Sequence, residues 1–233
     1  LQPLVKPKGI DDVPILSVTL WTRDPQRGAY ELRQVAHAIE AEIKRVPGTR
    51  NVYTIGGPDE TVHVSLDPQR LAGYGLTVSE LAAALQAASV VQHAGALVAN
   101  GDNVPVQAGE FLADRDEVAQ LVVAVREGRP IYLQDVATIT AGPAQPEQYV
   151  TFGAGPAAAQ KGIDLAGTAP AVTLAISKKP GENAIDVTNA VLRRIEQLRG
   201  TYIPEGVETT VTRNYGETAN DKALKLIQKL MFA

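Results

Sequence analysis

A strand–helix–strand pattern that occurs twice constrains the fold of this chain more than any other feature of its sequence. In each copy, a short run of apolar and β-branched residues is followed by apolar residues at helical spacing and then by a second short run. We expect strand, helix and strand at 15–21, 29–46 and 51–55, and again at 171–177, 183–199 and 207–212. Two such copies side by side form a split βαβ sandwich, in which one sheet carries two helices on one face. The predicted fold class is therefore α+β, with a split βαβ (ferredoxin-like) arrangement.

The segment between the two copies has elements of its own. Residues 60–66 alternate as a strand, and Thr77 with Glu80 forms a capping-box pattern before an alanine-rich helix. Two extended runs around a polar Asn-Gly tip predict a hairpin at about 91–111. We interpret 58–144 as a second small α+β unit that is inserted into the first.

These elements give a provisional organisation of the whole chain. We expect a linker at 1–14, the first half of the split βαβ unit at 15–57, the inserted unit at 58–144, the second half at 145–213 and a helix at 214–233. No stretch has the roughly 18 apolar residues that a membrane span needs, yet the chain becomes steadily more apolar toward Ala233. Because it also begins at Leu1 without a signal peptide, we interpret it as an excised fragment of a larger protein.

The composition argues against several classes of function. With 22 basic and 26 acidic residues, a net charge of −4 and no basic run, the chain is not expected to bind nucleic acid. It has no cysteine, and its 3 histidines show no metal-ligand spacing, so we expect no metal site. Its serines lack a G-x-S-x-G elbow and its glycine runs match no phosphate-binding loop, so we expect no catalytic residues and no cofactor. Binding, assembly and mechanical movement remain as functions.

Three groups of motifs, spaced over nearly all of the chain, connect it to a known family. They are Pro47-Gly48 with Asn51-Val52, Ile55-Gly56, Asp67-Pro68, Leu71 and Tyr74-Gly75-Leu76-Thr77; Gly128-x-Pro130-Ile131-Tyr132-Leu133-x-Asp135-Val136-Ala137; and Lys179-Pro180-Gly181-x-Asn183-Ala184. With these motifs the chain resembles the periplasmic part of resistance-nodulation-division (RND) efflux transporters of the acriflavine/multidrug resistance type. The resemblance implies one porter subdomain, which is a split βαβ sandwich in this family, with a docking subdomain inserted in it.

The resemblance also implies a location and partners. It places the chain in the periplasmic region of a bacterial inner-membrane protein, a proton-driven exporter whose proton-relay residues lie in membrane helices outside this chain. The expected partners are neighbouring copies in a homotrimer, contacted through the docking hairpin, a periplasmic adaptor (membrane fusion) protein and an outer-membrane channel. The hairpin arm at about 91–111 is several residues shorter than in well-known drug exporters, so the extent of arm exchange stays open. The helix at 214–233 would lead toward a membrane helix.

Substrate-binding residues are implied by position. The family binds its substrate between two porter subdomains, and the resemblance maps Tyr53, Ile55, Gln148 and Val150 onto the wall of that pocket. Drug exporters usually have phenylalanine where Ile55 stands, and only 5% of the residues here are aromatic, so this wall is less suited to stacking flat molecules. The alternative is that Ile55 and Val150 are core residues.

The predicted function is the substrate-binding and trimer-docking part of an exporter of small hydrophobic or amphiphilic molecules. Two alternatives stay open. One is an RND metal-ion exporter, against which the presence of a single methionine argues weakly. The other is a free-standing ferredoxin-like interaction module. Glycines favour a mobile loop in the insertion at 156–168, whose role as a substrate loop or as decoration also stays open.

Overall fold

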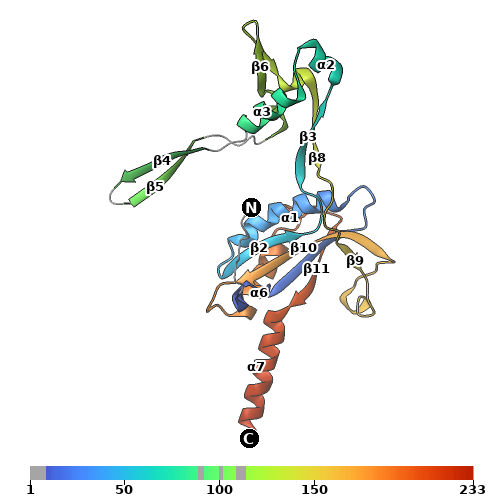
Figure 1. Cartoon of the computed structure of the whole chain (residues 1–233). Helices are drawn as coiled ribbons and strands as arrows, with labels where there is room; N and C mark the ends of the chain where they lie inside the picture. Colours follow the sequence, from blue (N-terminus) through green and yellow to red (C-terminus); the bar gives the residue numbers. More distant parts are fainter. Residues whose placement is uncertain (1–8, 89–91, 100–101, 109–113, 233) are drawn as a thin grey trace. The chain divides into compact units, whose positions relative to one another are not determined.

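The structure is a computed structural model that describes residues 9–88, 92–99, 102–108 and 114–232 (Figure 1). The chain forms two compact units, one of Leu1–Asp59 with Gln145–Ala233 and one of Glu60–Ala144. Each unit has its own hydrophobic core, built from its own helices and strands. The combination of helices with antiparallel strands confirms the predicted α+β class.

The first unit is built on an antiparallel sheet with the strand order β11-β1-β10-β2 (Figure 1). Its strands are β1 (Leu16–Thr22), β2 (Thr49–Ile55), β10 (Thr168–Lys178) and β11 (Val207–Asn214), and β9 (Thr151–Gly153) pairs with the start of β10. Helix α1 (Ala29–Lys44) connects β1 to β2, and α6 (Ala184–Gln197) lies between β10 and β11 in the chain. The two strand–helix–strand copies therefore interleave in one sheet, which is the split βαβ arrangement that the repeat predicts.

Alternation along the two central strands buries one face of this sheet. Leu16, Val18 and Leu20 of β1 are at most 1% exposed, because alternate side chains of a strand point to the same face. The same core contains Val172, Leu174 and Ile176 of β10, Leu32, Ala36, Ile39 and Ile43 of α1, and Val187, Val191 and Ile195 of α6. Burial of each large aliphatic side chain contributes about 1.5–3 kcal/mol, so this layer is the main source of stability in the first unit.

Local contacts shift the ends of some elements from their predicted positions. Helix α1 ends at Lys44, short of the predicted 46, and the Thr49 hydroxyl donates to the carbonyl of Val46 at 2.8 Å. Since this hydrogen bond helps to fix the turn after the helix, β2 already begins at Thr49 rather than at 51. A short 3-10 helix, η1 (Ile10–Asp12), interrupts the predicted extended linker.

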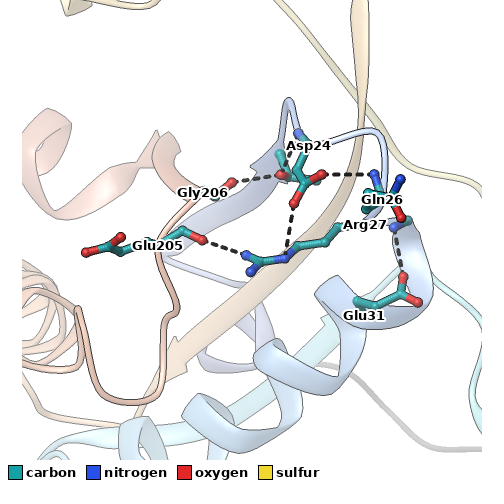
Figure 2. A network of polar contacts seen from close by, with 8 residues as sticks. Asp24, Gln26, Arg27, Glu31, Glu205 and Gly206 are labelled. Carbon is teal, nitrogen blue, oxygen red and sulfur yellow. Dashed lines mark hydrogen bonds and ion pairs between the residues drawn. The ribbon is translucent and has the colours of Figure 1, made fainter.

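A polar network ties the turn after β1 to the loop before β11 (Figure 2). The Thr22 hydroxyl donates to the carbonyl of Gly206 at 2.7 Å and accepts from the backbone N–H of Asp24 at 3.0 Å. Arg27 donates to the carbonyl of Glu205 at 2.6 Å, and its Nε lies 3.5 Å from a carboxylate oxygen of Asp24. The two copies of the repeat are therefore joined by polar contacts at this end of the sheet as well as through the core.

Helix α7 (Tyr215–Met231) continues directly from β11. Its first turn lies against α6 at Gly216, where a Cβ atom would come within 2.5 Å of the Thr188 hydroxyl. Further along, its large apolar side chains are exposed, among them Leu226 at 68% and Met231 at 81%. Among the helices that the structure describes, none is both long and apolar enough to cross a membrane.

The second unit combines short antiparallel pairs with short helices. Strand β3 (Glu60–Leu66) pairs with β8 (Ala137–Pro143), and β6 (Val122–Arg126) pairs with β7 (Arg129–Tyr132). The helices are α2 (Pro68–Gly73), α3 (Val78–Ala88), α4 (Arg115–Ala119) and α5 (Leu133–Val136). The predicted capping box opens α3, since Thr77 Oγ1 accepts from the N–H of Glu80 at 3.2 Å and Glu80 Oε2 accepts from the N–H of Thr77 at 2.8 Å.

A hairpin of β4 (Gln92–Ala99) and β5 (Asp102–Ala108) lies within the range expected for the arm. The strands pair from Gln92 opposite Ala108 to Ala99 opposite Asp102, with a bulge between His93 and Gly95. Residues 91 and 109–111 of the expected arm, and its tip at 100–101, lie outside the described residues.

Candidate functional site

The candidate site is the face of the first unit's sheet that points away from the core described above. A row of hydroxyls crosses this face, because Thr19 Oγ1 lies 2.9 Å from Thr173 Oγ1 and 3.2 Å from Thr212 Oγ1. Thr19 is only 4% exposed, and a hydroxyl so deeply placed needs such partners. Around Thr19, this face therefore carries a row of hydrogen-bonded hydroxyls.

Tyr53 and Ile55 lie on this face, at the edge strand β2. They are 43% and 36% exposed. By contrast, the side chain of Val52 lies between the helices and the sheet and is 4% exposed. Thr54 points to the helical side, where its hydroxyl donates to Glu40 of α1 at 3.1 Å. Ile55 is paired in register with Thr173, so it stands at the end of the hydroxyl row. The structure thus places Tyr53 and Ile55 as accessible neighbours, and Ile55 is not a core residue.

Val150 and Gln148 lie in a segment that precedes a strand, because β9 begins only at Thr151. Val150 is partly buried, and its carbonyl accepts a hydrogen bond from the N–H of Ala171 at 3.2 Å. A Cβ atom at Gly56 would come within 2.5 Å of Val150 Cγ2, so Val150 packs against the residue that follows Ile55. Gln148 is exposed. The structure brings Val150 next to the end of β2, where it has a packing role, and leaves Gln148 on the surface.

An aromatic pair covers part of the same face. The rings of Trp21 and Phe152 are stacked with their centroids 4.7 Å apart, and Trp21 is 2% exposed. The indole N–H donates to Thr210 Oγ1 at 2.9 Å. The Arg23 guanidinium carbon lies 5.2 Å from the centroid of the indole ring, in a cation–π contact. These contacts fix the indole on several sides and hold Arg23 beside it.

Two clefts border the insertion that the sequence analysis placed at 156–168. The larger, of ≈ 530 Å³, is lined by Trp21, Arg23, Lys161, Gly162, Ile163, Glu208, Thr209, Thr210 and Val211. The smaller, of ≈ 290 Å³, is lined by residues 152–158 of the insertion and its approach, together with Lys161, Ile163 and residues 210–212. The sequence analysis missed Trp21, Arg23 and Lys161. Strand alternation could have placed Trp21 on the same face as Thr19, but nothing in the sequence indicates that 161–163 lies opposite β11.

The groups on this face can bind a ligand. Neither cleft contains a histidine or cysteine that could act with a neighbouring group as nucleophile or general base. Across the part of the chain that the structure describes, no group of three or more His, Cys, Asp or Glu side chains could hold a metal ion. The arrangement offers hydroxyls, two aromatic side chains and a few charges to a ligand.

Comparisons with known proteins agree with this architecture. Residues 2–231 match the AcrB/AcrD/AcrF family. The chain is 28% identical over 195 residues to the cation efflux system protein CusA of Escherichia coli K12. The matched region covers 83% of this chain and 17% of CusA. It is 26% identical over 220 residues to the putative cation efflux system protein SilA of Salmonella typhimurium. This matched region covers 93% of the chain and 20% of SilA. The chain therefore spans one fifth or less of the length of these relatives. With a family match over nearly its full length, the chain belongs to the AcrB/AcrD/AcrF family of RND transporters.

Proposed function

We propose that this chain is the periplasmic porter and docking portion of an RND exporter, and that the exporter moves cations. The observation that carries the proposal is the likeness to two cation efflux proteins over 83% and 93% of the chain. The first unit would be the porter subdomain, which changes shape during transport, and the second unit would be the docking subdomain. This assignment favours the metal-ion alternative over the hydrophobic and amphiphilic substrates that the sequence resemblance suggested first.

In cation export, this chain would have a structural role. Its single methionine is Met231 on α7, and the described residues contain no cluster of metal-ligating side chains. Soft metal ions prefer thiolate and thioether ligands. The proposal therefore assigns no ligand of a transported metal ion to the residues that the structure describes.

The proposed partners follow from the same assignment. The exporter would be a homotrimer in which the β4–β5 hairpin contacts a neighbouring subunit, and it would work with a periplasmic adaptor and an outer-membrane channel. The hairpin supports this because a two-stranded hairpin is marginally stable in water unless it packs on further structure. The location would be the periplasmic side of a bacterial inner membrane.

Small hydrophobic or amphiphilic molecules are the second candidate cargo, and one observation favours them. Tyr53 and Ile55 present accessible apolar surface side by side on the open face of the sheet. An aromatic ring beside an aliphatic side chain is a common wall of small-molecule sites. Under the cation proposal, these two side chains would contact neighbouring parts of the transporter instead of cargo.

Growth assays with the complete transporter distinguish the two cargo classes. The transporter that contains this chain, expressed with its adaptor and channel in an efflux-deficient bacterium, is expected to raise the tolerated concentration of silver, copper, zinc or cobalt salts several-fold. Tolerance to hydrophobic dyes should not change, and the variant Tyr53→Ala with Ile55→Ala should keep its metal tolerance. Tolerance to dyes alone, lost in the double variant, would overturn the cation proposal in favour of the second candidate.

A further inference from the structure

The larger cleft of the first unit collects three charged side chains from three separate segments. Arg23 follows β1, Lys161 belongs to the insertion and Glu208 lies on β11. Glu208 is paired in register with Trp21, so it stands on the same face of the sheet as the indole. The cleft therefore has two cations and one carboxylate around an aromatic floor.

Several other charged side chains of the first unit are paired. Arg27, Arg33 and Arg199 pair with carboxylates of Asp24, Asp59 and Glu196 at 3.5, 2.5 and 2.7 Å. By contrast, within the residues that the structure describes, no ion pair connects Arg23, Lys161 or Glu208 to each other or to another side chain. Opposite charges that share one cleft without pairing can each bind a complementary group of a ligand.

Arg23 is held in place for such an interaction. Its guanidinium carbon lies 5.2 Å from the centroid of the Trp21 indole, and this ring is in turn fixed by Phe152 and by the hydroxyl of Thr210. A guanidinium has five N–H groups, and a cation–π contact with a ring leaves N–H groups available for a carboxylate. Preorganisation of this kind lowers the entropic cost of binding.

The size and remaining walls of the cleft fit a small organic molecule. Its volume of ≈ 530 Å³ lies within the roughly 300–1,000 Å³ that is typical of small-molecule sites. Ile163 adds apolar surface, and the hydroxyl of Thr210 adds a polar group. A ligand with both charges and an apolar body would match all of these features.

We propose that this cleft binds a small zwitterion of about dipeptide size. Its carboxylate contacts Arg23 and Lys161, its ammonium group contacts Glu208, and its apolar body lies against Ile163. A purely anionic ligand would face the carboxylate of Glu208, and a purely cationic one would face two cations. The proposal gives the insertion at 156–168 a role in ligand binding, and it does not depend on the cargo assigned above.

Trp21 is the single tryptophan of the chain and lines the cleft, so its fluorescence reports on binding. The complete 233-residue chain is titrated near neutral pH with three probes: phenylalanyl-phenylalanine with free ends, its N-acetyl derivative and its C-terminal amide. Since each blocked probe loses one charge-assisted contact, we expect the free dipeptide to bind at least about tenfold more tightly than either. Equal affinity for the free and N-acetyl forms, or no binding of the free dipeptide, would overturn the proposal.

Charge-removing variants test the assignment of each contact. Glu208→Gln should weaken binding of the free dipeptide about tenfold and leave binding of the N-acetyl form unchanged. Lys161→Gln should weaken binding of the free dipeptide and of its N-acetyl form to the same extent, and it should leave binding of the C-terminal amide unchanged. Lys179→Gln, which removes a charge outside the cleft, is the control and should change nothing. If Glu208→Gln binds the free dipeptide as tightly as the parent chain does, the zwitterion site is wrong, and circular dichroism establishes that each variant is folded.

Discussion

Glu42 of α1 and Arg194 of α6 form an ion pair that connects the two helices covering the sheet. Glu42 is 6% exposed and also pairs with Arg45. The hydrogen bond from Arg194 lowers the pKa of the Glu42 carboxyl below its ordinary value of 4.5, burial acts in the opposite direction, and the charge of Arg45 lowers the pKa further. The contact between α1 and α6 at this point therefore depends on the ionisation of Glu42.

The stability of the first unit should therefore depend on pH through Glu42. Because the pKa of Glu42 is lower in the folded chain than in the unfolded one, the ionised carboxylate stabilises the fold above pH 4.5, and this contribution is lost as the pH falls through the folded-state pKa. Glu42→Gln should lower the melting temperature near neutral pH. In acid, the variant and the parent chain should have nearly the same melting temperature. Thermal unfolding followed by circular dichroism at a series of pH values measures both effects.

The matched control is Glu196→Gln, which breaks the pair with Arg199. The side chain of Glu196 is 71% exposed, and exposed pairs contribute little, so its melting temperature should stay close to that of the parent chain at every pH. If Glu42→Gln lowers the melting temperature by the same amount in acid as at neutral pH, the predicted dependence of stability on the ionisation of Glu42 is wrong.

Phe152→Ala should destabilise the first unit by about 3 kcal/mol. The substitution removes the ring that stacks on Trp21 at 4.7 Å, and Phe152 is 9% exposed in a small cluster with Trp21, Ala169 and Ala171. Urea unfolding should show the loss of stability, and the emission of Trp21 should shift to longer wavelength as water reaches the indole. Phe232→Ala, at a position that is 91% exposed, should leave both measurements unchanged.

Gly216→Ala should separate the first turn of α7 from α6. A Cβ atom at Gly216 would lie 2.5 Å from Thr188 Oγ1 and 2.7 Å from the carbonyl oxygen of Ala184, so one helix has to move. We expect a loss of about 1–3 kcal/mol, as for other substitutions that overpack a close contact. Gly73→Ala in α2 is the control, because a methyl group at Gly73 would meet no heavy atom within 4 Å and alanine favours a helix. Equal stability of the two variants in urea would show that the contact at Gly216 is not close.

Leu133→Ala should weaken the second unit and leave the first intact. Leu133 is 0% exposed in a core made only of residues from the second unit, and removal of a buried leucine side chain typically costs about 2–5 kcal/mol. Urea unfolding followed by far-ultraviolet circular dichroism should show an earlier transition, while the fluorescence of Trp21 in the first unit should change at the same urea concentration as in the parent chain. Leu20→Ala, in the core of the first unit, should instead move the change in Trp21 fluorescence to lower urea, and a shift of the Trp21 signal in Leu133→Ala would show that the units unfold together.

Periodicity predicted the elements of the first unit well, because it reflects which side chains must be buried. Leu16, Val18 and Leu20 alternate in the sequence and face the helices in the structure. The turn after α1 was less predictable. Its position depends on a hydrogen bond from the Thr49 hydroxyl to the carbonyl of Val46, and hydrophobic periodicity contains no information about such a contact.

The candidate site was only partly predictable. The resemblance to RND exporters selected Tyr53 and Ile55, and alternation along β2 places both on the open face. It also selected Gln148 and Val150, which lie in the segment just before β9. Val150 is held by its packing against Gly56, a contact between segments far apart in the chain.

The sequence by itself determined the fold class, the repeat and the family, since all three depend on local periodicity and on the order of motifs. Only the tertiary structure decided that Arg23, Lys161 and Glu208 share one cleft. They come from a strand end, an insertion and the edge strand of the sheet. Their proximity results from the register of β1 with β11 and from the packing of the insertion around Trp21 and Phe152. Long-range packing of this kind depends on the shapes of many side chains at once, which no local pattern records.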